Sequence, residues 1–267
     1  MLRKVARFAI RKFRFALRKF GYDIYPTHGR RDDPIEDIQS LSPDRPIIFD
    51  VGANLGQTIA ELRTACPDAI IHAFEPGAAA FETLQRTWGG TSDVTLNNFA
   101  LGSEEAKRSF NEMLQHDMSS FLPTGKHGWG LITNRREVSI KTVDGYCAAN
   151  GIAQIDVLKC DTQGFDLEVL RGAQQMMARD AIRVVYVEIN FAELYVGQAA
   201  ADEIMSFLRL NGFELVTFYR FHNVDYRIGW TDALFRMPPE RPSRLAARSR
   251  VPAGWVAIWL ICAAGDA

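Results

Sequence analysis

The fold of this chain is decided by the stretch Pro46-Ile47-Ile48-Phe49-Asp50-Val51-Gly52-Ala53-Asn54-Leu55-Gly56-Gln57. An apolar run ends in an acid, and a turn with two glycines leads directly into a helix-patterned segment over 57–65. This order is typical of a buried parallel strand that feeds a nucleotide-binding turn. Glycines lack the Cβ atom where the backbone must turn and approach a ligand, and the helix that follows offers unpaired N–H groups. We therefore predict a cofactor site that uses Asp50, Gly52, Asn54 and Gly56.

A second acid lies in register with this turn. The apolar run over 69–74 ends at Glu75, about 20 residues after the turn, where an acid can accept both hydroxyls of a ribose. The ligand is therefore predicted to contain an adenosine. Asn54 stands where a dinucleotide fingerprint has its second glycine, which hinders close approach to a pyrophosphate. A ligand without phosphates is favoured over a dinucleotide and over an ordinary turn that binds nothing.

The rest of the chain alternates strands and helices. Strands are predicted near 46–51, 69–74, 94–99, 155–160, 182–189, 213–219 and 232–237. Helices are predicted near 56–65, 77–88, 142–150, 165–178 and 199–210. The expected fold is α/β, a Rossmann-like, doubly wound and mostly parallel sheet of seven strands, in one domain over 43–238. Asn98 and Phe99 follow the third strand and so lie on the edge of the sheet where ligands bind.

Residues 103–141 interrupt this rhythm. Short alternating runs at 108–113 and 137–141 indicate a β-hairpin or small antiparallel insertion with a polar tip over 115–134. Long loops of this kind often carry function, so the tip, which includes His116, is interpreted as a lid or substrate loop. The alternative is that these residues form a solvent-exposed loop with no function.

The two ends of the chain differ from the body. Residues 1–20 carry eight Lys or Arg and no acid, with apolar residues spaced three and four apart, which predicts a basic amphipathic helix. Such a helix can dock on the catalytic domain, or it can contact a membrane surface or a partner. Residues 22–42, rich in turn-forming residues, are interpreted as a linker, and the tail over 239–267 is assigned no role.

Charge and cysteine usage exclude several classes. Without residues 1–20 the chain carries 23 basic and 32 acidic side chains, a formal charge of −9, which argues against a nucleic-acid binder. The four cysteines stand far apart and form no Cys-x-x-Cys pair. A disulfide framework or zinc site is therefore not expected. We expect a reducing, cytoplasmic location, and the basic segment over residues 1–20 allows peripheral contact with a membrane.

A longer motif makes a family resemblance specific. The segment over 158–173, Leu-Lys-Cys-Asp-Thr-Gln-Gly-Phe-Asp-Leu-Glu-Val-Leu-Arg-Gly-Ala, resembles the hallmark of FkbM-type methyltransferases. Three other pieces fit in order: the turn over 50–56, the acid motif over 74–76, and Asn-Phe-Ala-Leu over 98–101. Ser119-Ser120 and Val187-Glu188 are also similar to that family. The resemblance covers roughly residues 45–237.

The resemblance implies a class I methyltransferase that uses S-adenosylmethionine to methylate a hydroxyl, often on a sugar, a glycan or a secondary metabolite. The cofactor-binding residues would be Asp50, Gly52, Asn54, Gly56, Glu75, Asn98 and Phe99. This chain departs from the common pattern at Cys160, where an aliphatic residue is frequent, and at Thr162-Gln163, where Val-Glu is common. The loss of that carboxylate leaves Asp161 as the acid of the turn.

Methyl transfer from a sulfonium is an in-line displacement, so the protein must align the acceptor oxygen and remove its proton. Asp161, at the carboxyl end of the strand beside the cofactor strand, is the first candidate for a general base or an acceptor-orienting group. The alternative is that it caps the helix that begins near Gly164. Glu188 and His116 are the other catalytic candidates.

No metal is predicted, because the sequence has no His-x-x-x-His and no paired acids at ligand spacing. Asp161 and Glu188 at neighbouring strand ends leave a Mg²⁺ site open as an alternative. Two other functions also stay open. One is a non-catalytic membrane-associated or scaffolding protein on a methyltransferase fold, and the other is a nicotinamide-dependent oxidoreductase or epimerase.

Overall fold

The computed structural model describes residues 33–239, so the helix expected over residues 1–20 and the tail from residue 240 lie outside the described residues. The main sheet has eight strands. They are β1 (Ile47–Val51), β2 (Ile70–Phe74), β3 (Val94–Asn97), β7 (Ile155–Cys160), β8 (Ile182–Asn190), β9 (Glu214–Phe218), β10 (His222–Val224) and β11 (Arg227–Arg236). The predicted α/β fold with a mostly parallel sheet is confirmed.

The eight strands occupy seven positions. The sheet runs β3-β2-β1-β7-β8-β11, with the first five strands parallel and β11 antiparallel to β8. On the far side of β11, β10 pairs with Arg227, Ile228 and Trp230, and β9 pairs with the part over 233–236. β9 and β10 therefore share one edge position. Eight strands are observed where seven were expected, because the chain leaves the sheet between β9 and β10, around Arg220 and Phe221.

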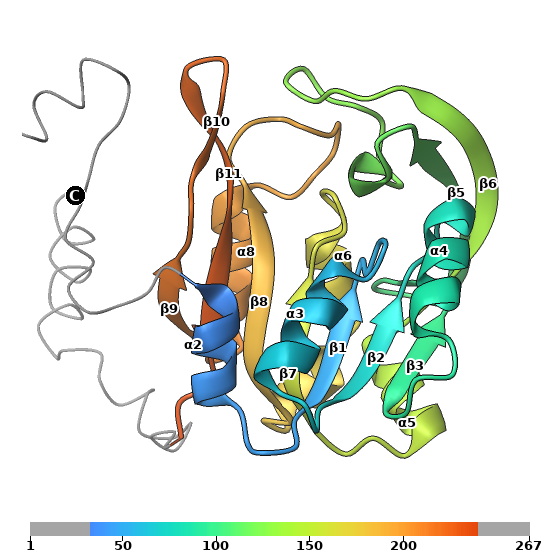
Figure 1. The fold of residues 1–267 in the computed structure, drawn as a ribbon. Helices are drawn as coiled ribbons and strands as arrows, with labels where there is room; N and C mark the ends of the chain where they lie inside the picture. Colours follow the sequence, from blue (N-terminus) through green and yellow to red (C-terminus); the bar gives the residue numbers. More distant parts are fainter. Residues whose placement is uncertain (1–32, 240–267) are drawn as a thin grey trace, which may run out of the picture.

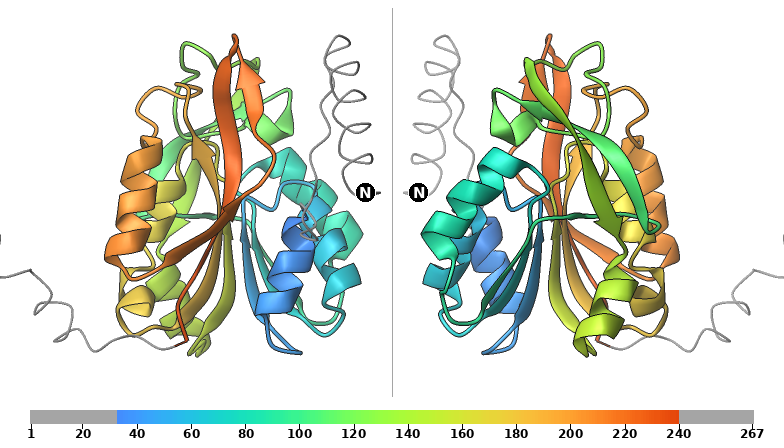
Figure 2. Two further views of the ribbon diagram at one scale, coloured as in Figure 1. Left: turned by 90° about the vertical axis from the view of Figure 1, so that its left-hand side faces the viewer. Right: turned by 90° about the vertical axis from the view of Figure 1, so that its right-hand side faces the viewer.

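Helices cover both faces of this sheet (Figures 1 and 2). One face carries α5 (Val143–Asn150), α6 (Asp166–Arg171), α7 (Gln174–Ala178) and α8 (Ala201–Leu210), and the other carries α2 (Pro34–Leu41), α3 (Gln57–Ala65) and α4 (Ala78–Trp88). Each face has its own hydrophobic core, and β1 supplies both, with Phe49 packed on one side and Ile48 on the other. This alternation explains why the strand reads as a continuous apolar run.

The interruption over 103–141 is confirmed as a small antiparallel insertion. β5 (Ala106–Met113) pairs antiparallel with β6 (Ile132–Lys141), and the short β4 (Ala100–Leu101) pairs parallel with β6. A single 3-10 turn, η1 (His116–Met118), lies in the connection. Figure 1 shows the insertion at the carboxyl end of the parallel strands. It is tied to the loop after β8 by backbone bonds, such as the one from Gly125 N–H to Leu194 C=O at 2.7 Å.

Two segments differ from expectation. Residues 34–41, which were expected to be part of a linker, form α2. The Asp33 carboxylate caps the N–H groups of Ile35 and Glu36, and the apolar side chain of Ile38 is buried against α3 and the sheet. The helix expected over 165–178 breaks into α6 and α7 at Gly172, where a Cβ atom would lie 2.0 Å from the carbonyl oxygen of Gly102. Within the described part of the chain, no helix is long and apolar enough to cross a membrane.

Candidate functional site

The glycine turn after β1 packs against a neighbouring strand end. Gly52 has φ +79°, and a Cβ atom there would lie 1.9 Å from the carbonyl oxygen of Asp161, so the turn accepts only glycine. The N–H groups of Gly52 and Ala53 both donate to Phe74 C=O, at 3.0 and 3.1 Å. Gly56 has another role, because its missing Cβ makes room for the Trp88 indole. The turn is thus fixed between the ends of β2 and β7.

Glu75 follows β2 and lies beside this turn. Its carboxylate accepts the N–H of Asn54 at 2.8 Å and the N–H of Gly77 at 2.7 Å. The side chain is buried, and burial raises the pKa of Glu75 to about 7, although the two N–H donors favour the charged form. A carboxylate with two fixed donors on its oxygens is held in one orientation. Glu75 therefore has both the place and the rigidity expected of a ligand-binding acid.

A buried lysine connects the two acids of the neighbouring strand ends. Lys159 Nζ lies 2.9 Å from Asp50 Oδ1 and 3.7 Å from Asp161 Oδ2, and it donates to the Gly52 carbonyl at 3.0 Å. Burial alone would lower the pKa of Lys159, but Asp50 and Asp161 outweigh burial and raise it. The Asp50 carboxylate is fully buried, and Lys159 is its only side-chain partner within residues 33–239. Lys159 thus fixes the glycine turn in two ways, through the carbonyl of Gly52 and through the carboxylate of Asp50.

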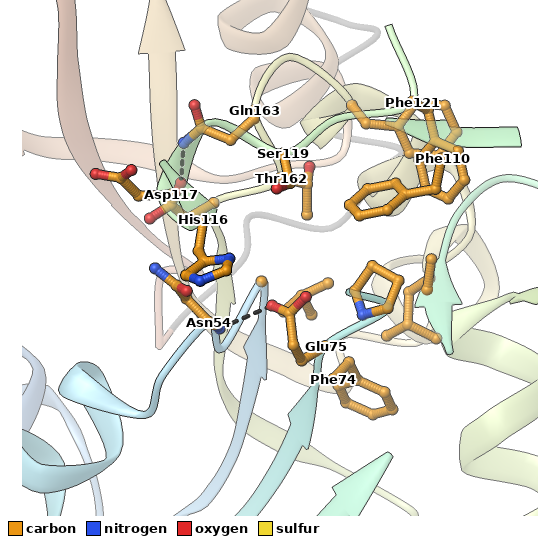
Figure 3. Close-up of a pocket in the computed structure, with 17 residues that line it drawn as sticks. Asn54, Phe74, Glu75, Phe110, His116, Asp117, Ser119, Phe121, Thr162 and Gln163 are labelled. Carbon is orange, nitrogen blue, oxygen red and sulfur yellow. Dashed lines mark hydrogen bonds between the residues drawn. The ribbon is translucent and has the colours of Figure 1, made fainter. Parts of the chain in front are cut away.

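These strand ends open into a shared pocket. Its lining includes Gly52, Asn54, Glu75 and Asp161, together with His116, Asp117 and Ser119 from the insertion. Figure 3 shows Asn54, His116 and Asp117 at one end, Phe110 and Phe121 at the other, and Glu75 between them. Phe121 packs between Phe110 and Phe165, with both ring-centroid distances at 4.9 Å. The insertion therefore supplies one wall of the pocket, both polar and aromatic.

The three catalytic candidates are placed differently. Asp161 and His116 line the pocket, whereas Glu188 does not. Asp161 has 41% of its side chain exposed. Glu188 is buried and accepts Asn190 Nδ2–H at 3.0 Å; burial, followed by repulsion from Asp161, raises its pKa well above the usual range.

Asp161 does not cap helix α6, and the nearby Asp166 carboxylate instead binds the turn that precedes the helix. The Asp166 carboxylate accepts Thr162 N–H at 2.9 Å and the Thr162 hydroxyl at 3.0 Å. Helix α6 begins at Asp166, and its N-cap residue Phe165 makes no side-chain capping bond. Asp161 therefore does not cap a helix, and it lines the pocket.

The remaining predicted cofactor residues lie behind the lining. Asn98 Nδ2 donates to the Glu75 carbonyl at 2.9 Å, and Phe99 packs on Phe74 with Lys141 Nζ 4.3 Å from its ring centroid. With Asp50 and Gly56 they support the strand ends without lining the pocket. Of the described residues, no group of three or more His, Cys, Asp or Glu is arranged to bind a metal ion.

Sequence reasoning missed several members of the site. Phe110 and Phe121 carry no local signal, because only the folded insertion brings them against Phe165. Lys159 had a signal that could have been used. A lysine inside a fully buried strand needs a carboxylate partner, and Asp50 is the acid that faces Lys159 on the adjacent strand.

A mostly parallel sheet with a glycine turn after β1 and a fixed acid after β2 defines a Rossmann-like nucleotide-binding domain. The sequence profile of the methyltransferase FkbM domain matches residues 50–215, more than half of the chain. The chain belongs to the FkbM methyltransferase family.

Individual relatives are distant. The 2-O-methyltransferase NoeI of Sinorhizobium fredii is 25% identical over 190 residues, which cover 67% of this chain and 76% of NoeI. The hexuronic acid methyltransferase AglP of Haloferax volcanii is 25% identical over 161 residues, which cover 59% of this chain and 62% of AglP. The crystal structure of methyltransferase FkbM from Methylobacillus flagellatus aligns with a TM-score of 0.45 at 17% identity, over 72% of this chain and 44% of that one.

Proposed function

We propose that this chain transfers the methyl group of S-adenosylmethionine to a hydroxyl of a sugar, a glycan or a small metabolite. The observation that carries the cofactor assignment is the Glu75 carboxylate, fixed by the N–H groups of Asn54 and Gly77 and lining the pocket (Figure 3). An acid at the end of the second strand can accept hydrogen bonds from both ribose hydroxyls.

Other features of the pocket fit the same cofactor. Asn54 Oδ1 is buried and has no hydrogen-bond partner within the described residues, so it is available to accept a bond from a polar ligand group. The rings of Phe110, Phe121 and Phe165 offer an apolar surface suited to an adenine.

The proposed acceptor is a hydroxyl group, and the proposed base is Asp161. When bound, S-adenosylmethionine supplies an electrophilic methyl group. The protein then has to orient the acceptor oxygen and take its proton. Asp161 lines the pocket with a partly exposed carboxylate, and no helix-capping duty competes for it. NoeI and AglP, a 2-O-methyltransferase and a hexuronic acid methyltransferase, support a sugar hydroxyl as the acceptor.

We place this reaction in the cytoplasm. Cys66, Cys147 and Cys160 are free and buried, which supports a reducing compartment. Contact of residues 1–20 with a membrane surface remains part of the proposal, and that segment lies outside the described residues.

Calorimetric titration tests the cofactor assignment. We expect S-adenosylhomocysteine to bind, NAD⁺ not to bind, and Glu75→Ala to weaken binding about 100-fold, since two charge-assisted hydrogen bonds are lost. Glu82→Ala, on the exposed side of α4, is the matched control and should bind as the wild type does. Binding of NAD⁺ alone would favour an oxidoreductase, and binding of neither ligand would favour a scaffolding role.

Cofactor affinity should depend on pH near neutrality. The pKa of Glu75 is raised to about 7, so about a tenth of the molecules carry the charged form at pH 6. If ribose hydroxyls bind the carboxylate, the dissociation constant for S-adenosylhomocysteine should rise about tenfold from pH 8 to pH 6. In Glu75→Gln the affinity should be low and independent of pH over this range. An equal slope in the variant would assign the titration to another group.

A further inference from the structure

Gln163 stands where three segments meet. It follows Asp161 and Thr162 in the turn between β7 and α6, and its φ of +54° is left-handed, a conformation that a residue with a side chain seldom adopts. Its backbone carbonyl accepts the hydroxyl of Ser120 at 2.7 Å, which ties the turn to the insertion. The unusual backbone is therefore held in place by a buried side chain from the insertion.

The side chain of Gln163 makes two further bonds. Its Nε2–H donates to Asp161 Oδ1 at 2.8 Å, drawn as a dashed line in Figure 3, and its Oε1 accepts the Tyr195 hydroxyl at 2.6 Å. A carboxylate only accepts hydrogen bonds, so the amide nitrogen must face Asp161 and the amide oxygen must face Tyr195. The chemistry of the two partners thus determines the orientation of the amide.

Tyr195 is a rigid anchor for this arrangement. The side chain is fully buried and packs with Met113, Met118 and Leu194. Its N–H donates to Gln198 Oε1 at 2.8 Å. The hydroxyl of this buried tyrosine fixes the Gln163 amide, and the amide in turn fixes one carboxylate oxygen of Asp161. Lys159 Nζ lies 3.7 Å from the other carboxylate oxygen.

We propose that Gln163 is a positioning residue that orients the Asp161 carboxylate toward the acceptor and keeps a second carboxylate away from it. The inference rests on the proposed role of Asp161 as the group that takes the acceptor proton. Gln163 suits this duty because its amide donates to Asp161 and accepts from Tyr195 at the same time. A glutamate could accept from Tyr195, but it would place two acceptors 2.8 Å apart, and two adjacent carboxylates cannot both stay ionised.

The first test needs no acceptor. In protein labelled with ¹³C at the Asp carboxyl carbons, the Asp161 signal is assigned by its loss in Asp161→Asn and followed against pH. In Gln163→Glu we expect its titration to move to higher pH by about 1 unit or more, because the pair shares a proton. Gln174→Glu makes the same charge change at an exposed site and should leave the titration unchanged. An Asp161 titration that is unaltered in Gln163→Glu would overturn the inference.

The second test measures positioning through turnover. With S-adenosylmethionine and a methyl glycoside of a neutral hexose or hexuronic acid that supports turnover, Gln163→Ala should lower kcat about 10- to 100-fold without changing the affinity for S-adenosylhomocysteine. Gln163→Glu should recover activity as the pH rises. Tyr195→Phe should lower kcat less than Gln163→Ala does, and the double variant should be no worse than Gln163→Ala.

The outcomes separate this inference from the proposed function. If Asp161→Asn keeps its activity, the proposed base is wrong whatever Gln163 does. If Asp161→Asn is inactive but Gln163→Glu has the pH profile and Asp161 titration of the wild type, only the positioning role is overturned.

Discussion

Asp161→Asn should lower kcat about 10²- to 10⁴-fold while leaving the affinity for S-adenosylhomocysteine almost unchanged. Asparagine has nearly the same shape, and its carbonyl can still accept the N–H of Gln163 that now lies 2.8 Å from Asp161 Oδ1. It cannot take a proton from the acceptor hydroxyl. The variant should therefore bind the cofactor product and fail at the chemical step, which transfer of a radiolabelled methyl group at saturating substrate would measure.

The other two candidates provide the comparison. His116 lines the pocket, so His116→Ala tests whether an imidazole takes the proton instead. Glu188 is buried and lies outside the lining, so Glu188→Gln should be close to the wild type in activity once the melting temperature confirms that it folds. An Asp161→Asn protein that remains active beside an inactive His116→Ala protein would transfer the base role to His116.

The strands and the ligand edge were predictable because burial leaves a clear pattern. β1, β2 and β7 are largely buried and mainly apolar, and the carboxyl ends of parallel strands meet at one edge. This is enough to bring Gly52, Glu75 and Asp161 into one pocket without any knowledge of the side-chain contacts.

Other parts depend on contacts between segments far apart in the sequence. The aromatic wall needs β5 and the insertion to fold over the sheet edge, so Phe110 and Phe121 could not be assigned from local patterns. The linker prediction was wrong for residues 34–41, because turn-forming residues such as Asp33 and Pro34 also begin helices. The helix before β1 is stabilised by the packing of Ile38 in the core, a tertiary contact that residue spacing alone does not reveal.

Lys159→Met should reduce the free energy of unfolding by about 3–5 kcal/mol, as measured by urea denaturation. The change leaves Asp50 charged, fully buried and without the ion pair that Lys159 now makes at 2.9 Å. The loss should be larger than that of an ordinary core substitution of equal volume, because an unpaired charge is added to the lost packing.

The double variant Asp50→Asn, Lys159→Met separates charge from shape. Removal of both charges should restore much of the stability, since the penalty comes from one unpaired group more than from the absence of the pair. Affinity for S-adenosylhomocysteine should stay low in the double variant, because Lys159 also holds the Gly52 carbonyl at 3.0 Å. Recovery of both stability and binding would mean that the glycine turn holds its shape without the lysine. Recovery of stability alone would assign the buried pair a function beyond folding: it keeps the cofactor turn in the conformation that binds.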